Sequence, residues 1–149
     1  MIHHKVTELA DLLRWAATGK HLVTYRRLHS CFEKNVPLNE RYRLLEKAVH
    51  TLANPTLLDY GCLMSLANGL PGDDFFTRFK RLRAAEYLAE MGHGSLGRST
   101  TKKRRIALLE REAVYRHATV RCDPPPAHAA AYSIKRDSAS DLANPPTLR

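Results

Sequence analysis

The chain has 149 residues, enough for one domain of ordinary size or for one domain with a tail. Hydrophobic residues make up 44% of it, which is sufficient for a packed core and argues against wholesale disorder. No apolar run approaches the ~18 residues of a membrane span, and the N-terminus lacks the apolar centre of a signal peptide. Three scattered cysteines do not make a disulfide framework, so we expect a reducing, cytoplasmic compartment.

The positive charge is concentrated in one third of the chain. Lys and Arg number 24 against 15 Asp and Glu, a formal net charge of +9. Residues 75–121 carry a net charge of +8, whereas residues 1–74 carry +1 and residues 122–149 carry none. A field localised in this way favours a polyanionic partner, with nucleic acid first. The alternative is a solvated helical surface that keeps the protein in solution.

Two helices are expected near the N-terminus. The first is capped by Thr7, closes at Gly19 and has one apolar face, made of Leu9, Leu12, Leu13 and Ala16. A short second helix is expected to follow Thr24 and to stop before Pro37.

Two longer helices are expected further along the chain. Asn39 is a suitable cap for the third helix, which ends at Asn54 and has an apolar face of Tyr42, Leu45, Val49 and Leu52. Asp73 or Asp74 is expected to cap a fourth helix that runs to about Met91.

The segment between the third and fourth helices has a different pattern. Apolar residues surround Gly61, and the run ends in Asn68-Gly69, a dipeptide typical of tight hairpin turns. We therefore expect a short two-stranded element here. A buried helix over Leu58–Ala67 is the competing interpretation.

The expected fold is mainly α: a winged helix-turn-helix-like domain with a small β-hairpin and appended C-terminal helices. The expected winged-helix-like domain covers residues 1–91, and residues 92–98 form a Gly-rich joint. Residues 99–120 are expected to form a basic C-terminal helix. The Pro-, Ala- and Ser-rich residues 121–149 have the composition of a disordered tail.

The start of the chain resembles a known family of DNA-binding domains. The stretch Leu12–Gly19, followed by Val23-Thr24-Tyr25 and Leu28, is similar to the opening of the DNA-binding domain of alkylguanine-DNA alkyltransferases and alkyltransferase-like proteins. In that family a first helix ends at Gly, and a Thr/Ser-Tyr pair starts the next helix. The resemblance implies that residues 25 onward begin a helix-turn-helix that contacts DNA.

The resemblance continues over roughly residues 9–90. Asn54-Pro55 is similar to the Asn hinge that ends the family's recognition helix, and Cys62 lies at the family's distance from hinge to reactive cysteine. The run Asn68–Gly72 occupies the place of the family's glycine-containing wing. The resemblance therefore implies a scaffold that binds DNA.

Two departures argue against the family's chemistry. The reactive Pro-Cys-His-Arg motif is replaced here by Gly61-Cys62-Leu63-Met64, so no neighbouring His can produce a thiolate. The arginine that replaces a flipped base in the family corresponds to Leu45. We therefore expect no catalytic activity, and we interpret Cys62 as a core residue.

The candidate contacts to nucleic acid are one tyrosine and eleven basic residues. Tyr25 would stand at a helix N-terminus, where N–H groups and the helix dipole favour a phosphate. The basic candidates, which could contact phosphates or base edges, are Arg41, Arg43, Lys47, Arg78, Lys80, Arg81, Arg83, Lys102, Lys103, Arg104 and Arg105.

The sequence thus predicts a non-catalytic DNA-binding protein of alkyltransferase-like, winged-helix type that contacts the backbone of double-stranded DNA through a basic surface. RNA binding through the same surface is not distinguished from it. The alternative is a protein-interaction module that binds an acidic protein, or dimerises through Ile106, Leu109 and Ala113. No metal site, cofactor site or membrane contact is expected, because no metal-ligand module or phosphate-binding glycine loop is present.

Overall fold

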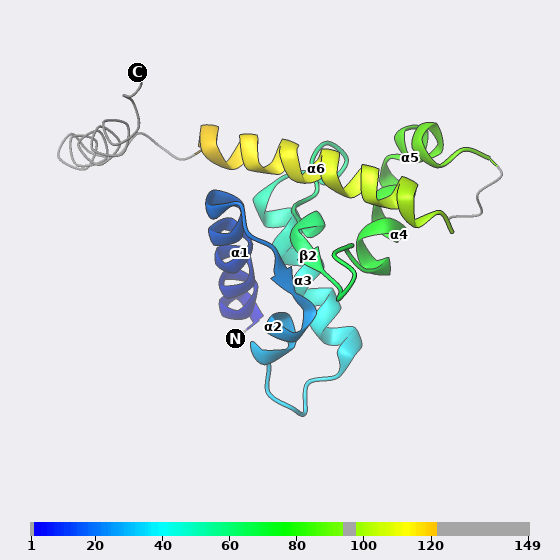
Figure 1. The fold of residues 1–149 in the computed structure, drawn as a ribbon. Coiled ribbons are helices and arrows are strands. Elements are labelled where there is room, and N and C mark those ends of the chain that lie inside the picture. Colours follow the sequence, from blue (N-terminus) through cyan, green and yellow to red (C-terminus); the bar gives the residue numbers. More distant parts are fainter. Residues whose placement is uncertain (1, 94–97, 122–149) are drawn as a thin grey trace, which may run out of the picture. The chain divides into compact units, whose positions relative to one another are not determined.

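The computed structural model describes residues 2–93 and 98–121 of the chain. Within these ranges the structure is mainly helical, with two short strands (Figure 1). The elements in chain order are α1 (Ile2–Gly19), β1 (Val23–Thr24), α2 (Tyr25–Ser30), α3 (Leu38–Leu52), the 3-10 helix η1 (Tyr60–Leu63), β2 (Met64–Ser65), α4 (Asp73–Leu82), α5 (Ala84–Met91) and α6 (Thr100–Arg121). None of the helices in the described ranges combines the length and the apolar composition needed to cross a lipid bilayer.

The chain divides into two compact units, Met1–Thr119 and Val120–Arg149. Nearly all of α6 therefore belongs to the same unit as α1–α5. Residues 94–97 of the expected joint lie outside the described residues, and so do residues 122–149 of the expected tail.

The apolar face of α1 packs into the core as the sequence predicts. Its buried residues include Leu9, Leu13 and Ala16. The helix ends at Gly19, also as expected, but it begins at Ile2. Thr7 therefore lies inside the helix, and the prediction that it is the cap is wrong.

The next two helices begin at residues with extended backbone. The Thr24 hydroxyl accepts a hydrogen bond from the Arg27 N–H at 3.1 Å and so caps α2, which follows Thr24 as predicted. α3 begins after Pro37, whose φ of −65° suits a helix start, so Asn39 lies within the helix instead of capping it. α3 ends before Ala53, close to the predicted end.

The two strands form a parallel sheet and not the expected hairpin. Val23 lies opposite Met64, and Thr24 lies opposite Ser65. The predicted β-hairpin is therefore wrong, because the partner of the 64–65 strand comes from a segment about forty residues earlier in the sequence. The described fold is thus mainly helical with a two-stranded parallel sheet.

The Asn68-Gly69 turn itself is present. The Leu66 N–H donates to the Leu70 carbonyl at 2.7 Å, and Gly69 has a φ of +87°, which glycine adopts at little cost. The Asn68 side-chain oxygen accepts from the Leu70 N–H at 3.0 Å. The competing helix over residues 58–67 is also not observed, since only the single turn of η1 forms there.

The predicted fourth helix consists of two helices. The chain breaks between α4 and α5 at Arg83, which has φ and ψ of −132° and 54°. Gly72 is the residue before α4, so Asp73 and Asp74 lie in its first turn. Because the break changes the direction of the chain, α5 buries Tyr87 instead of continuing the apolar face of α4.

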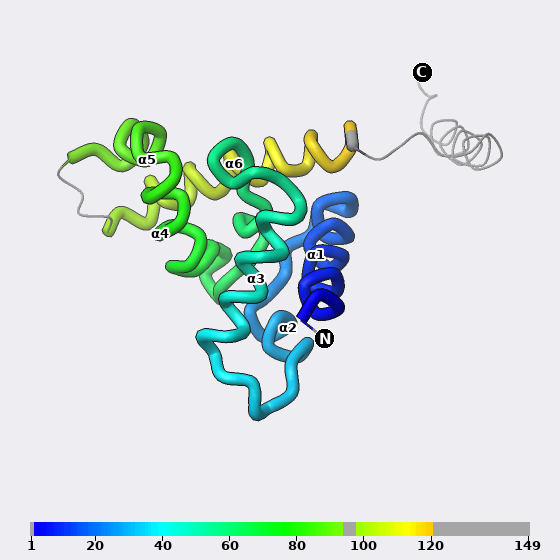
Figure 2. The backbone as a smooth tube through the Cα atoms, turned by 180° about the vertical axis from the view of Figure 1, so that it is seen from behind, coloured from blue at the N-terminus to red at the C-terminus, as the bar shows by residue number. Residues whose placement is uncertain are grey.

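α3 and α6 complete the core. α3 lies between α1 and α4 in both views of the fold (Figure 2). α6 crosses the segment that links α3 to α4 (Figure 1). It enters the core through Ile106, Val114 and Ala118. Its Arg111 guanidinium is buried and donates to the carbonyl oxygens of Cys62, Met64 and Gly69 at 2.6, 3.2 and 2.9 Å.

Candidate nucleic-acid interface

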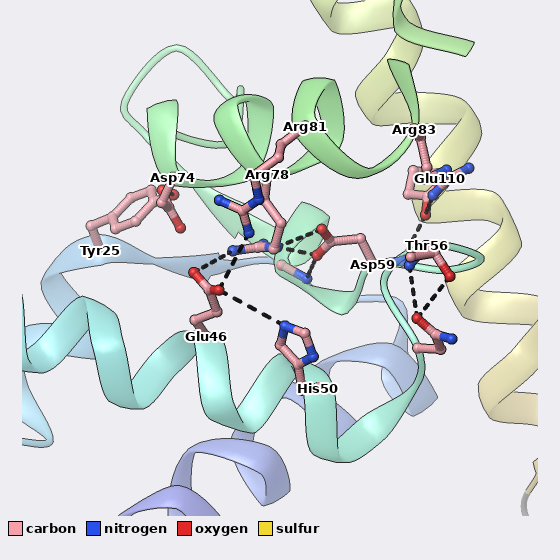
Figure 3. A network of polar contacts seen from close by, with 12 residues as sticks. Tyr25, Glu46, His50, Thr56, Asp59, Asp74, Arg78, Arg81, Arg83 and Glu110 are labelled. Atoms are coloured by element: carbon pink, nitrogen blue, oxygen red, sulfur yellow. Dashed lines mark hydrogen bonds and ion pairs between the residues drawn. The ribbon is translucent and has the colours of Figure 1, made fainter. Parts of the chain in front are cut away.

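Arg78 lies inside the protein and not on its basic surface. Its side chain is 2% exposed, and its guanidinium donates to both oxygens of the Asp59 carboxylate at 2.7 and 2.9 Å (Figure 3). Asp59 is also buried and accepts a further hydrogen bond from the Gly61 N–H. A bidentate, buried pair of this kind neutralises the cation. The sequence prediction of a phosphate contact from Arg78 is therefore wrong.

Arg83 takes part in the same buried network. It donates to Glu86 at 2.8 Å and to Glu110 of α6 at 2.5 Å, and its side chain is only 8% exposed. Glu110 in turn accepts from the Asp59 N–H at 2.7 Å (Figure 3). Arg83 therefore fixes the α4–α5 break to α6, and its charge is compensated by two carboxylates.

The Tyr25 hydroxyl is already engaged on both sides. Tyr25 is buried; its O–H donates to the Asp74 carboxylate at 2.7 Å and accepts from the Gly72 N–H at 2.7 Å. Burial, reinforced by the nearby Asp74 charge, raises the pKa of the Tyr25 phenol well above its usual value. The Tyr25 hydroxyl therefore joins the start of α2 to the start of α4 and already has a donor and an acceptor within the protein.

Two basic residues of α3 are held by the protein itself. Arg41 donates to the carbonyl oxygens of Val36 and Glu33 at 2.9 and 3.1 Å, and so fixes the loop before α3. Arg43 is exposed and pairs with Glu40 one turn earlier. Because the pair is solvated, it is weak, but the Glu40 carboxylate offsets the charge of Arg43 on this face.

The remaining candidates on α3 and α4 are exposed. Lys47 and Arg81 both line a surface groove between α1, α3 and α4. Arg81 lies 3.6 Å from the Glu46 carboxylate, a loose ion pair. Lys80 lies on the other side of α4, with its ammonium 5.6 Å from the centre of the Tyr87 ring.

Four consecutive cations, the α6 basic cluster, occupy the first turns of α6. The cluster consists of Lys102, Lys103, Arg104 and Arg105, and all but the half-buried Lys103 are exposed. Ser99 precedes the helix, and its hydroxyl accepts from the Lys102 N–H at 3.2 Å. Cations at a helix N-terminus oppose the helix dipole, so this arrangement costs stability unless an anion is bound.

Most of the charge of the α6 basic cluster is not neutralised. Lys102 donates to the Met91 carbonyl at 3.0 Å, and Arg104 donates to the Asn68 carbonyl at 3.1 Å. The Lys103 ammonium lies 5.1 Å from the centre of the Phe76 ring. Carbonyl oxygens and aromatic rings position a cation but carry no net charge. In the described part of the chain only Arg105 of the cluster has a carboxylate partner, Glu90 at 3.0 Å.

Cys62 has the surroundings of a core residue. It is fully buried, and burial raises the pKa of its thiol well above the usual value; the charges of Glu110 and Asp59 raise it further. No three His, Cys, Asp or Glu side chains in the described ranges are grouped as a metal site would require.

Sequence reasoning did not identify which charged residues are internal. Neither the buried network of Asp59, Arg78, Arg83 and Glu110 nor the burial of Arg111 against backbone carbonyls was foreseen. For Arg78 a signal was available, because it lies three residues after Phe75 and four before Leu82 and so shares their apolar face. The same signal was available for Arg111, because it lies four residues after Ala107 and three before Val114 and so shares their apolar face.

No protein-family model matches this chain. No curated protein and no solved structure is significantly similar to it. The chemistry of the described side chains therefore has to carry the functional assignment.

Proposed function

We propose that this protein is a non-catalytic DNA-binding protein that contacts the phosphate backbone of a duplex through the α6 basic cluster. The observation that carries the proposal is the state of these cations: Lys102, Lys103 and Arg104 are positioned by neutral groups and keep their full charge. Protein surfaces that bind nucleic acid use such charges to displace the counterions of the backbone.

The arrangement also reduces the entropic cost of binding. A free lysine or arginine side chain loses about 2 kcal/mol of rotamer freedom when it is fixed. The contacts to Met91, Phe76 and Asn68 restrict these side chains before any phosphate arrives. The cluster is therefore preorganised for an anion.

The helices at the start of the chain support the helix-turn-helix part of the proposal. α1, β1, α2 and α3 follow one another in the order expected from the sequence, whereas β2 pairs with β1 in a parallel sheet and forms no hairpin in the described residues. The exposed faces of α3 and α4 contribute less positive charge than the sequence suggested, because Arg43 pairs with Glu40 and Arg81 lies beside Glu46. We therefore assign the main backbone contact to α6 and not to α3.

An acidic protein surface is the second candidate partner. Leu108 and Leu109 are 53% and 49% exposed on α6, and exposed leucines of this kind occur at protein interfaces. The dimer surface predicted from the sequence is wrong at one position, because Ile106 is 3% exposed and belongs to the core. A protein partner would therefore contact Leu109 on the exposed surface of α6 and could not reach Ile106.

Charge reversal of the cluster separates these functions. The variant K102E/R104E/R105E is compared with R14E/K20E/R116E, which changes three exposed cations in α1, in the residue after it, and in the C-terminal half of α6. We expect the first variant to lose about tenfold or more of its affinity for duplex DNA in fluorescence anisotropy, and the second to change little. Equal losses, or no binding of the wild type at low salt, would contradict the proposal. An RNA duplex and a single strand of each type serve as parallel ligands.

A further inference from the structure

A surface groove of the described residues lies away from the α6 basic cluster. It has a volume of about 850 Å³ and is bounded by α1, α3 and α4. Its lining is partly apolar, with Ile2 and Val6 from α1 and the Tyr42 ring from α3. A groove of this size can hold a small organic molecule.

At one end of the groove, some carboxylate oxygens accept no hydrogen bond from the described residues. Asp73 and Asp74 of α4 lie here, level with Tyr42 of α3. The Oδ1 atom of Asp74 accepts from Tyr25, but its Oδ2 atom is buried and has no hydrogen-bond partner in the described part of the chain. No hydrogen bond or ion pair within the described ranges engages the Asp73 carboxylate. A buried acceptor left unpaired is costly, so this end favours a ligand that donates N–H groups.

The other end of the groove carries cations. The central Glu46 carboxylate lies 3.6 Å from Arg81, 3.8 Å from His50 and 3.9 Å from Arg78 (Figure 3). These loose contacts share one acid among three basic groups, of which only Arg78 has a close carboxylate partner elsewhere. Lys47 also lines the groove, and its ammonium makes no ion pair within the described ranges. This end favours an anionic group.

The spacing of the two ends limits the size of the ligand. Asp74 and Arg81 are seven residues apart on α4, which corresponds to about 10 Å along the helix. A nucleoside monophosphate with an exocyclic amino group spans a comparable length. So does a tripeptide with free termini, at about 3.3 to 3.6 Å per residue.

We propose that this groove binds a small amphoteric molecule, with an N–H donor facing Asp73 and Asp74 and an anionic group facing Lys47 and Arg81. The Tyr42 ring and the apolar side chains of α1 would contact the body of the molecule between these ends. This binding is independent of the α6 basic cluster, because no residue of that cluster lines the groove.

Isothermal titration calorimetry with two matched ligand series tests the proposal. The first series is adenosine monophosphate, purine riboside 5′-monophosphate, whose base lacks the amino group and has no other N–H donor, and adenosine, which lacks the phosphate. The second is trialanine, its N-acetylated form and its C-terminal amide. We expect the unmodified member of one series to bind. Removal of either its N–H donor or its anionic group should lower the affinity about tenfold. The series that binds identifies the source of the ligand. The proposal would be overturned if neither unmodified ligand bound, or if removing the N–H donor and removing the anionic group both left the affinity unchanged.

Variants locate the binding in the groove. Asp73→Asn and Lys47→Gln each remove one charge from an exposed side chain, and we expect each to weaken the ligand about tenfold. Lys34→Gln, an exposed lysine outside the groove, is the control and should bind normally. The K102E/R104E/R105E variant should also bind normally, so loss of DNA binding and loss of this ligand are separable results. Normal binding by both groove variants would contradict the assignment to this groove.

Discussion

The buried charge of Arg78 is compensated mainly by one close partner, Asp59. The Asp59 carboxylate receives two hydrogen bonds from the guanidinium, and both side chains are almost completely buried. Removing water from two charges is expensive, and only the direct contact between them offsets that cost. Either residue alone would be an uncompensated charge in the core.

We expect the replacement Arg78→Met to lower the free energy of unfolding by about 3 to 5 kcal/mol, because it leaves the Asp59 charge buried without a partner. Lys80→Met on the same helix is the matched control, since Lys80 is exposed, and it should change stability by less than about 0.5 kcal/mol. Urea denaturation followed by circular dichroism measures both. Similar stabilities for the two variants would contradict the role given to the buried pair.

The Cys62 thiol should be inert in the folded protein. Because burial raises its pKa and closes access to it, we expect iodoacetamide at pH 8 to leave Cys62 unmodified under native conditions. The same reagent should modify it after denaturation. Peptide mapping by mass spectrometry measures the alkylation of Cys62 in the native and in the denatured protein, with the partly exposed Cys31 as an internal comparison. Rapid native labelling of Cys62 would show that the thiol is accessible.

At the scale of the elements, helices were easier to predict than strands. The periodic apolar residues of α1 and α3 and the start of α2 after Thr24 depend on local signals, so the sequence was sufficient for them. The parallel pairing of β1 with β2 joins segments far apart in sequence, and no local pattern encodes it. The split of the fourth helix depends on Arg83 contacting Glu110 of α6, which is likewise a long-range interaction.

The cap of α2 is open to a direct test. α2 has only six residues, so it depends strongly on the hydrogen bond from the Arg27 N–H to the Thr24 hydroxyl. We expect Thr24→Ala to cost about 1 kcal/mol of stability. Thr18→Ala, at an exposed position of α1, is the control and should be within about 0.5 kcal/mol of the wild type. Chemical denaturation compares them, and an unchanged Thr24→Ala variant would show that the cap is dispensable.

At the scale of the molecule, the distribution of charge matters more than its total. The sequence correctly located the excess of cations in residues 75–121. It could not show that Arg78, Arg83 and Arg111 are used within the structure, because burial is decided by packing between distant segments. Once these are set aside, the α6 basic cluster remains as the principal uncompensated charge of that region. The site is therefore smaller than the sequence suggested.

The central claim is that the cations of the α6 basic cluster contact the phosphates of duplex DNA. The most direct test is the affinity of the wild type and of K102E/R104E/R105E for a labelled duplex over a series of salt concentrations. Each lost phosphate contact reduces the slope of log affinity against log salt by about 0.9. We therefore expect the slope of the variant to be shallower by about 1.8, one contact each for Lys102 and Arg104, because Arg105 is already paired with Glu90. Identical slopes for the two proteins would contradict the claim.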